Sequence, residues 1–180
     1  MNADYSSLSS LFDTVWSQLS RGVADRRHPA RHPTLATLGP DGPELRTLVL
    51  RGADRASATL ELHTDAASPK AAQIAAEPRV ALHVWLPKPR LQLRARARAS
   101  ITAGDPALFA RLPPQAQANY GGAVPGSRPG DTANTAKGDP ARFACILCRL
   151  TDLDILHLGE PHIRALYRAS DGWQGQWIAP

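Results

Sequence analysis

The sequence is poor in cysteine, in lysine and in long apolar runs, and each shortage excludes a class of protein. Two cysteines among 180 residues cannot form a disulfide-dense scaffold, and a chain of this length buries a core without one. No run of about 18 apolar residues is present that could span a bilayer. The first residues, MNADYSSLSSLF, lack the basic and then apolar pattern of a signal peptide. We therefore expect one cytoplasmic domain, residues 1–180, without a membrane partner.

The two cysteines form a C-x-x-C pair, Cys145 and Cys148, whose setting argues against redox or zinc chemistry. The surrounding residues RFACILCRL indicate a strand, in which residues three apart point to opposite faces. A thioredoxin-type pair needs a helix start, and structural zinc needs four ligands. His28 and His32 have metal-like spacing only in a helix, which the two prolines that follow them forbid. We expect core cysteines, a solvated linker around the histidines, and no metal.

The net charge of +5 comes almost wholly from arginine, since the chain has only three lysines. Such a balance fits nucleic acid, a membrane surface or a small anion. In LQLRARARA, strand alternation places Gln92, Arg94, Arg96 and Arg98 on one face. No aromatic residues interleave with them as a stacking platform would require. This pattern favours a solvated or subunit-interface face, so we expect no nucleic-acid partner.

The pattern of apolar residues predicts one helix followed by many short strands. A stripe from Leu8 to Leu19 predicts an amphipathic helix, with Ser6 or Asp4 as its N-cap. From Thr34 onward, apolar runs separated by turns such as PDGP are typical of antiparallel hairpins. The fold class is mainly β (α+β), a six-or-so-stranded antiparallel barrel with a few peripheral helices. We divide the chain into the N-terminal helix (1–24), a strand core (33–103), short helices with a Gly/Pro-rich loop (104–140) and C-terminal strands (141–180).

The segment HTDAASPKAAQ, residues 63–73, predicts a helix start with an unusual charge. Ser68 is a preferred N-cap and Pro69 is preferred at the first helical position. Lys70 in the first turn has the wrong sign for the helix dipole, which indicates either a bound anion or an ordinary solvated lysine. On the strand ELRTLVLR, Arg46 and Arg51 face opposite sides, so at least one points toward the core or a ligand.

In order and spacing, these segments resemble the pyridoxamine 5'-phosphate oxidase family of FMN-binding split β-barrels. That family has an R-x-V-x-L-[KR] strand, a [FY]-[YH]-T-[ND]-x-x-S-x-K segment, an N-P-R at the end of a helix, and a strand with R-Q-V-[RL]. The matching residues are Arg46 to Arg51, Leu62 to Lys70, Glu77 to Arg79, and Leu91 to Arg94.

The resemblance implies a homodimer with FMN at the subunit interface. The FMN phosphate is expected at Arg46, Thr64, Ser68 and Lys70, and Gln92 is expected at the pyrimidine edge of the flavin. Arg164 matches an arginine that reaches the flavin of the other subunit, and either Arg94 or Arg164 stabilises reduced flavin. The remaining positions implied to bind the cofactor are Thr47, Leu48 and Val49 through their backbone, together with Arg51 and His63.

The departures from the family concern the substrate more than the cofactor. Val124 replaces a tyrosine of the substrate-phosphate loop, and Trp177 replaces a C-terminal arginine. Arg128 is retained, and Thr132 stands for a serine, so both are candidate substrate ligands. We expect an FMN-dependent oxidoreductase acting on a small substrate. The alternatives are a genuine pyridoxamine/pyridoxine 5'-phosphate oxidase, a non-catalytic flavin-binding protein, and a basic nucleic-acid-binding barrel.

Overall fold

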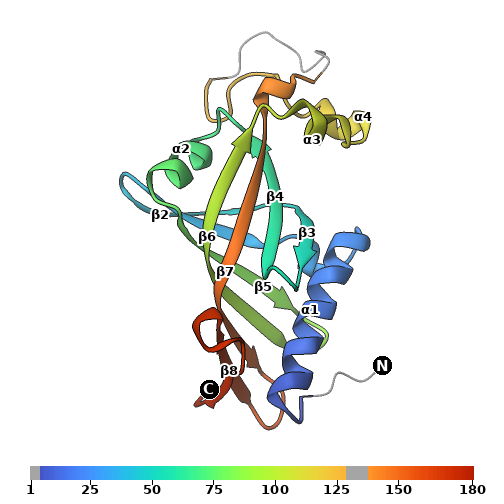
Figure 1. Ribbon diagram of the computed structural model, residues 1–180, viewed down its shortest axis with the longest axis vertical. Coiled ribbons are helices and arrows are strands. Elements are labelled where there is room, and N and C mark those ends of the chain that lie inside the picture. Colours follow the sequence, from blue (N-terminus) through green and yellow to red (C-terminus); the bar gives the residue numbers. More distant parts are fainter. Residues whose placement is uncertain (1–4, 129–137) are drawn as a thin grey trace.

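The protein is described by a computed structural model, in which residues 5–128 and 138–180 are placed. Within them, antiparallel strands form one sheet that curves into a barrel, and α1 lies along one side of it (Figure 1). The helices are α1 (Leu8–Ala24), α2 (Pro69–Ala76), α3 (Pro106–Ala110) and α4 (Pro114–Gln117), with short 3-10 turns η1 (Pro29–Arg31), η2 (Pro140–Arg142) and η3 (Ala169–Asp171). The strands are β1 (Thr34–Gly39), β2 (Gly42–Thr47), β3 (Leu50–Asp54), β4 (Thr59–Asp65), β5 (Arg79–Leu86), β6 (Leu91–Ala103), β7 (Phe143–His157), β8 (Ile163–Arg168) and β9 (Gln176–Ile178).

The predicted antiparallel β class is confirmed, but the prediction of about six strands is wrong, because the described chain has nine. The strand order is β2-β1-β5-β6-β7-β4-β3, and β8 pairs with β7 and β9. The predicted single strand ELRTLVLR is two strands, because the chain changes partners in its middle. β2 pairs with β1, whereas β3 pairs with β4, and between them the N–H of Leu48 donates to the carbonyl of Pro33 at 3.0 Å.

The long strand β7 connects the two ends of the molecule. It pairs with β6 along its whole length, with β4 over its first half and with β8 over its second half. A bulge at Thr151, opposite the step from Arg96 to Ala97, inserts one residue and reverses which β7 residues face the core. Cys148 and Leu150 are buried before the bulge, and Leu153 and Ile155 after it.

Helix α1 packs its apolar stripe against the barrel, as the sequence predicts. Its N-cap is Ser7, one residue later than Ser6, because Ser7 and Ser10 bond each other's backbone N–H in a capping box. Asp4, the other predicted cap, lies outside the described residues. The expectation of a solvated linker after the helix is wrong for His28, which is buried and bonded to Gln18 at 3.0 Å.

Tyr167 joins α1 to the C-terminal strands. Its fully buried ring packs on Phe12, and its hydroxyl donates to the carbonyl of Leu8 at 2.7 Å. Burial raises the pKa of Tyr167 to about 12 from its ordinary value of 10.0. The pKa of Tyr167 is higher in the folded protein than in the unfolded chain, so the protonated hydroxyl stabilises the fold. This stabilisation is complete below pH 10 and is lost as the pH rises from about 10 to about 12.

We predict that Tyr167→Phe lowers the free energy of unfolding by about 1 kcal/mol at pH 7, because one buried hydrogen bond is lost. The variant should also lose less stability than the natural protein between pH 9 and pH 11. Urea unfolding at both pH values measures the two effects. An alkaline loss of the same size in both proteins would contradict the role given to this hydroxyl.

Candidate functional site

The predicted helix start at the end of β4 is a polar cluster. The hydroxyls of Thr64 and Ser68 lie 3.1 Å apart, and the ammonium of Lys70 donates to Thr64 Oγ1 at 3.1 Å. Ser68 is the N-cap residue of α2 as predicted, yet its side chain makes no capping hydrogen bond and faces Thr64 instead. The first turn of α2 therefore gathers two buried hydroxyls and a half-buried cation.

Arg46 reaches the same region from β2. Its guanidinium donates to Thr37 Oγ1, to Gln73 Oε1 at 3.2 Å and to the Glu44 carboxylate at 2.9 Å. Gln73 lies on α2, one turn after Lys70. Its bond to Arg46 therefore ties Arg46 to the helix that carries the lysine. Thr37, Glu44 and Gln73 were not predicted from the sequence, although Thr37 alternates with the buried Leu35 on the core side of β1.

The electrostatics of this cluster favour an anion. Burial lowers the pKa of Lys70 from its ordinary value, the nearby Arg46 lowers it further, and Asp65 opposes both. Holding two cations near each other in a partly buried site is unfavourable, and a bound anion would remove this repulsion. The group formed by Arg46, Thr64, Ser68 and Lys70, which we call the anion cradle, thus fits a phosphate.

Arg51 is the extra residue of a β-bulge between β3 and β4. Leu50 pairs with Leu62 and Gly52 with Glu61, which leaves Arg51 without a strand partner. Its Nε is buried and has no hydrogen-bond partner among the described residues. Bulges commonly re-aim a side chain beside a functional site, and an unpaired buried guanidinium nitrogen calls for an acceptor.

His63 is directed away from the cradle, because neighbouring strand residues point to opposite faces. Its Nε2 lies 2.7 Å from Glu61 Oε1, its ring makes an edge contact with Phe143 at 4.9 Å, and its Nδ1 is buried without a partner among the described residues. Glu61, His63 and Cys145 form the one cluster of potential metal ligands that the described ranges contain. Burial raises the pKa of the Cys145 thiol to about 11.

Gln92, Arg94 and Arg164 gather at the other end of the barrel. Arg164 forms a two-pronged pair with the Asp154 carboxylate at 3.0 and 2.8 Å, and Arg94 contacts the same carboxylate. Burial would raise the pKa of Asp154, but hydrogen bonds from both arginines outweigh it and bring the pKa below its ordinary value. Gln92 lies next to this cluster, since Leu156 pairs with both Gln92 and Arg164. We call Gln92, Arg94 and Arg164 the distal group.

Thr64 of the cradle and Gln92 of the distal group lie far apart along β7. Thr64 pairs with Ala144 near the start of β7, and Gln92 pairs with Leu156 near its end. These β7 residues are twelve apart, which corresponds to about 40 Å along an extended strand. The structure therefore brings together Arg46, Thr64, Ser68 and Lys70, and it separates Thr64 from Gln92 along β7.

The remaining described candidates lie at the end of β2, in the link from β2 to β3, and in the loop after α4. Thr47 and Arg128 are exposed, Leu48 and Val49 are half-buried, and Thr132 lies outside the described residues. The backbone N–H of Leu48 is already bonded to Pro33, so it is not free for a ligand. The substituted positions Val124 and Trp177 are both exposed.

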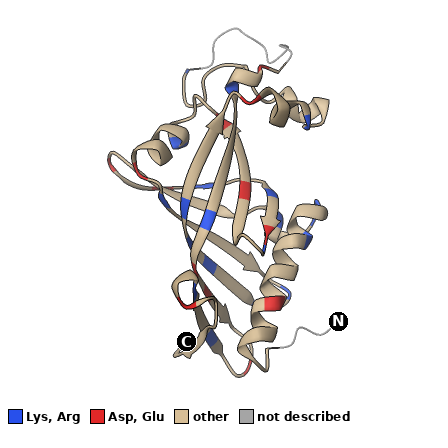
Figure 2. Ribbon diagram, viewed as in Figure 1, with Lys and Arg blue, Asp and Glu red and all other residues tan. Residues whose placement is uncertain are grey.

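The two cysteines and the arginines of β6 lie on the faces that strand alternation predicts. Cys145 and Cys148 are buried in separate apolar clusters, as expected for opposite faces of a strand. Arg96 pairs with Asp152 on the exposed face, as Arg94 does with Asp154. Lysine and arginine are distributed over helices, strands and loops (Figure 2). Within the described ranges, no helix has the length and apolarity needed to cross a membrane.

Comparison with protein families identifies the chain. Residues 13–103, just over half of it, match the family described as pyridoxamine 5'-phosphate oxidase, FMN-binding domain. The protein belongs to this family, as the motifs around Arg46, Lys70 and Gln92 predict. No curated protein matches the sequence.

Solved structures share the fold over nearly the whole chain. A pyridoxamine 5'-phosphate oxidase-related, FMN binding protein of Nostoc punctiforme is 27% identical with a TM-score of 0.78, covering 93% of this chain and 96% of its own. PhzG of Burkholderia lata is 16% identical with a TM-score of 0.69, covering 94% and 92%. A Clostridium acetobutylicum protein related to general stress protein 26 is 10% identical with a TM-score of 0.62, covering 88% and 97%. The last two show a likeness of fold.

Proposed function

We propose that the protein is a cytoplasmic, homodimeric FMN-binding flavoprotein that acts as an oxidoreductase on a small substrate. The observation that carries the proposal is the anion cradle, in which Arg46 and Lys70 are held close together beside two buried hydroxyls. Family membership and the likeness to the FMN binding protein of Nostoc punctiforme support it.

In this proposal, the cradle binds the FMN phosphate. Lys70 and Arg46 neutralise it, while Thr64 and Ser68 donate hydrogen bonds. The pKa of Lys70, lowered in the free protein by burial and by Arg46, would rise toward its ordinary value once the phosphate is bound. Thr47 to Val49 would lie along the ribityl chain and the ring through their backbone, and Arg51 and His63 are proposed as further contacts of the cofactor.

The distal group would complete the site of a second chain. Gln92 would bond the pyrimidine edge of the partner's flavin, and Arg164 would present its charge to the same edge. The separation of Thr64 from Gln92, about 40 Å along β7, supports the homodimer, because a second chain could bring its distal group to the helix start that carries the cradle. Asp154 holds Arg164 and Arg94 in place and would moderate the positive charge that they offer to reduced flavin.

FMN would supply the redox chemistry, and the chain would supply binding, orientation and charge. Arg128 and Thr132 are proposed to hold an anionic group of the substrate. The replacements at Val124 and Trp177 favour a substrate other than pyridoxamine 5'-phosphate.

We predict that the purified protein is yellow and releases one FMN per chain on denaturation. Absorbance near the flavin bands and mass spectrometry of the released cofactor measure this directly. Colourless protein that takes up no added FMN would refute the proposal. Turnover of pyridoxamine or pyridoxine 5'-phosphate under oxygen would identify a genuine oxidase of that substrate, and flavin binding without reduction by any tested donor would favour a non-catalytic role.

A further inference from the structure

Three side chains that commonly bind metals lie together on the outer face of β4 and β7. His63 and Cys145 stand directly opposite each other in the antiparallel pairing of the two strands, and Glu61 is two residues before His63 on β4. Strand alternation therefore places all three on one face, opposite to Thr64 of the cradle. Their ligand atoms lie within 4.8 Å of one another. We call Glu61, His63 and Cys145 the ligand cluster.

The separations within the ligand cluster suit a bound ion. A tetrahedral zinc ion with bonds of about 2.0 to 2.3 Å holds its ligand atoms about 3.3 to 3.8 Å apart. Glu61 Oε1 and His63 Nε2 are closer than this, at 2.7 Å, so an ion would move them apart slightly. The Glu61 side chain is 39% exposed, which leaves it free to rotate and leaves the ion a route from solvent.

His63 has a ring nitrogen for which the protein supplies no partner. Its side chain is only 10% exposed, and its Nδ1 is buried without a hydrogen-bond partner among the described residues. Burial lowers the pKa of His63 from its ordinary value, so the ring is neutral at pH 7 and offers a lone pair without first losing a proton. Buried polar atoms are almost always satisfied, so this imidazole calls for a ligand.

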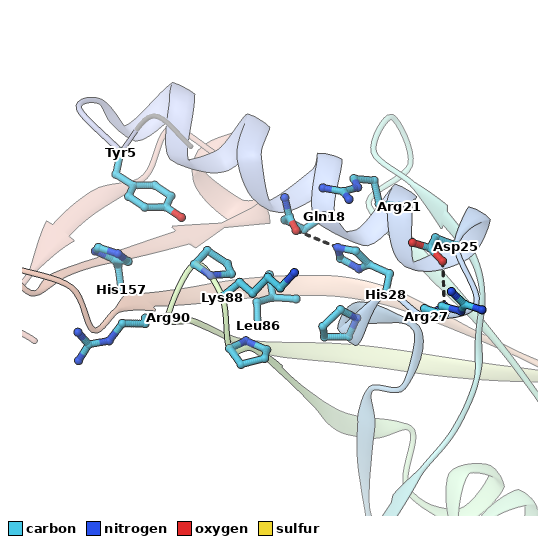
Figure 3. A pocket seen from close by; sticks show the side chains of 13 residues that line it. Tyr5, Gln18, Arg21, Asp25, Arg27, His28, Leu86, Lys88, Arg90 and His157 are labelled. Atoms are coloured by element: carbon cyan, nitrogen blue, oxygen red, sulfur yellow. Dashed lines mark hydrogen bonds between the residues drawn. The ribbon is translucent and has the colours of Figure 1, made fainter. Parts of the chain in front are cut away.

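Two other histidines of the described chain lack such surroundings. Figure 3 shows His28 and His157 beside a cavity between α1 and the β5–β6 turn. The described residues that line this cavity include no cysteine, and Asp25 is their one carboxylate. Both ring nitrogens of His28 have partners, which are the Gln18 amide and the N–H of Ala30. Within the described ranges, a histidine, a thiol and a carboxylate meet only at the ligand cluster.

The charges of the ligand cluster match a divalent cation. The carboxylate of Glu61 and the thiolate of Cys145 together carry two negative charges, which equal the charge of the ion. Arg51 is the nearby cation that opposes binding, since its charge contributes to the lowered pKa of His63. The thiol packs in the apolar cluster that contains Phe143, and such surroundings strengthen a metal–sulfur bond by excluding water.

We propose that Glu61, His63 and Cys145 bind a borderline-soft divalent cation, for which zinc is the probe, with water in the fourth position. Imidazole, thiolate and carboxylate are the three ligand types that zinc takes in proteins, and three protein ligands with one water make an open site. When the metal–sulfur bond forms, the thiol proton passes to solvent.

This site differs from the sequence expectation of no metal, which rested on residues close together in the chain. The ligand cluster instead joins residues of two strands that are more than eighty residues apart. The proposal does not rest on the proposed flavin function, because it uses the sheet face opposite to the cradle. A contact of His63 with the cofactor would be made by its backbone when its side chain holds the ion.

The test titrates zinc by calorimetry into the full-length protein after bound metal has been removed with a chelator. We expect saturable binding of one ion per chain. Cys145→Ser and His63→Gln should each weaken it at least about a hundredfold, since the loss of a group that merely orients a ligand already costs tenfold to a hundredfold. Glu61→Gln changes a partly exposed side chain that the fold does not need, and should weaken binding at least about tenfold.

Cys148→Ala is the matched control, because it removes the other thiol, which faces the apolar core on the opposite side of β7. Its zinc affinity should change less than about twofold. The cadmium-113 NMR signal of the cadmium-loaded protein should report a sulfur ligand in the control and lose it in Cys145→Ser. Circular dichroism of each variant verifies that the fold is kept.

The pH dependence gives a readout that a merely structural role of Cys145 would not produce. Burial raises the pKa of its thiol to about 11, so the thiol is protonated near neutral pH and binding releases one proton. The apparent zinc affinity should therefore rise about tenfold per pH unit between pH 6 and pH 8, and Cys145→Ser should lose this slope.

Absence of saturable binding would overturn the proposal, as would equal zinc affinity in Cys145→Ser and the natural protein. A loss in Cys148→Ala as large as that in Cys145→Ser would overturn it too. The titration is run with and without added FMN. Zinc binding by a protein that takes up no flavin would refute only the function proposed above, and flavin binding without zinc binding would refute only the metal site.

Discussion

Replacing Lys70 by alanine is expected to weaken FMN binding by about tenfold to a hundredfold, because one charge-assisted hydrogen bond to the phosphate is lost. The free protein should not lose stability. Burial and Arg46 lower the pKa of Lys70 in the folded state, so its charged form is disfavoured there, and removing it relieves that cost. Without FMN, we therefore expect the variant to have the same melting temperature as the natural protein or a slightly higher one. With FMN, we expect its melting temperature to be lower than that of the natural protein. Flavin fluorescence titration and thermal unfolding measure the two effects.

Lys88→Ala is the matched control, since it removes the other lysine of the described chain from a site remote from the cradle. Its FMN affinity should be that of the natural protein. Lys70→Arg should retain most of the affinity, because the charge is kept. Equal FMN affinity in Lys70→Ala and the natural protein would make Lys70 an ordinary solvated lysine and would remove the cradle from the site.

Mixing two defective chains is expected to restore FMN binding. A Lys70→Ala chain lacks part of the cradle, and a chain with Gln92→Ala and Arg164→Ala lacks the distal group. If each flavin is bound by the cradle of one chain and the distal group of the other, a mixed dimer has one intact site and one doubly defective site. Random 1:1 refolding makes half of the dimers mixed, so about a quarter of all sites should bind with full affinity.

A mixture of Lys70→Ala with Arg46→Ala provides the control for this experiment. Both changes fall in the cradle, so every site in every dimer carries one defect and no recovery is expected. Recovery in the control as strong as in the test pair, or none in either, would show that one flavin is not shared between the cradle of one chain and the distal group of the other.

The cradle could be predicted from the sequence because most of it is contiguous. Thr64, Ser68 and Lys70 fall within seven residues at a strand-to-helix joint, where local rules of capping and helix charge apply. The partners that hold Arg46 could not be predicted in this way. Thr37 and Gln73 come from β1 and α2, and their approach depends on how the barrel closes. The same holds for Asp154, which meets Arg94 across sixty residues of sequence.

The class of fold followed from strand alternation, but the number and limits of the strands did not. At Thr151 the buried residues of β7 change from even to odd numbers, so one continuous strand has the pattern of two. At Leu48 and Val49 the reverse holds, and two strands have the pattern of one, because the apolar run continues through the point where the chain changes its pairing partner. Both errors have one physical source, which is that a side-chain pattern records burial and not hydrogen-bond partners.

The segment from Gly104 to Arg142 leaves and re-enters the sheet at a single point. Ala103 pairs with Ala144, and the N–H of Gly104 donates to the carbonyl of Phe143 at 2.9 Å, so the two ends meet as in a hairpin. A closed insertion of this kind can be lengthened at a small cost in loop entropy, while β6 and β7 keep their register. Evolution and protein engineering could therefore add residues to the segment that carries Arg128 without rebuilding the barrel that would hold the flavin.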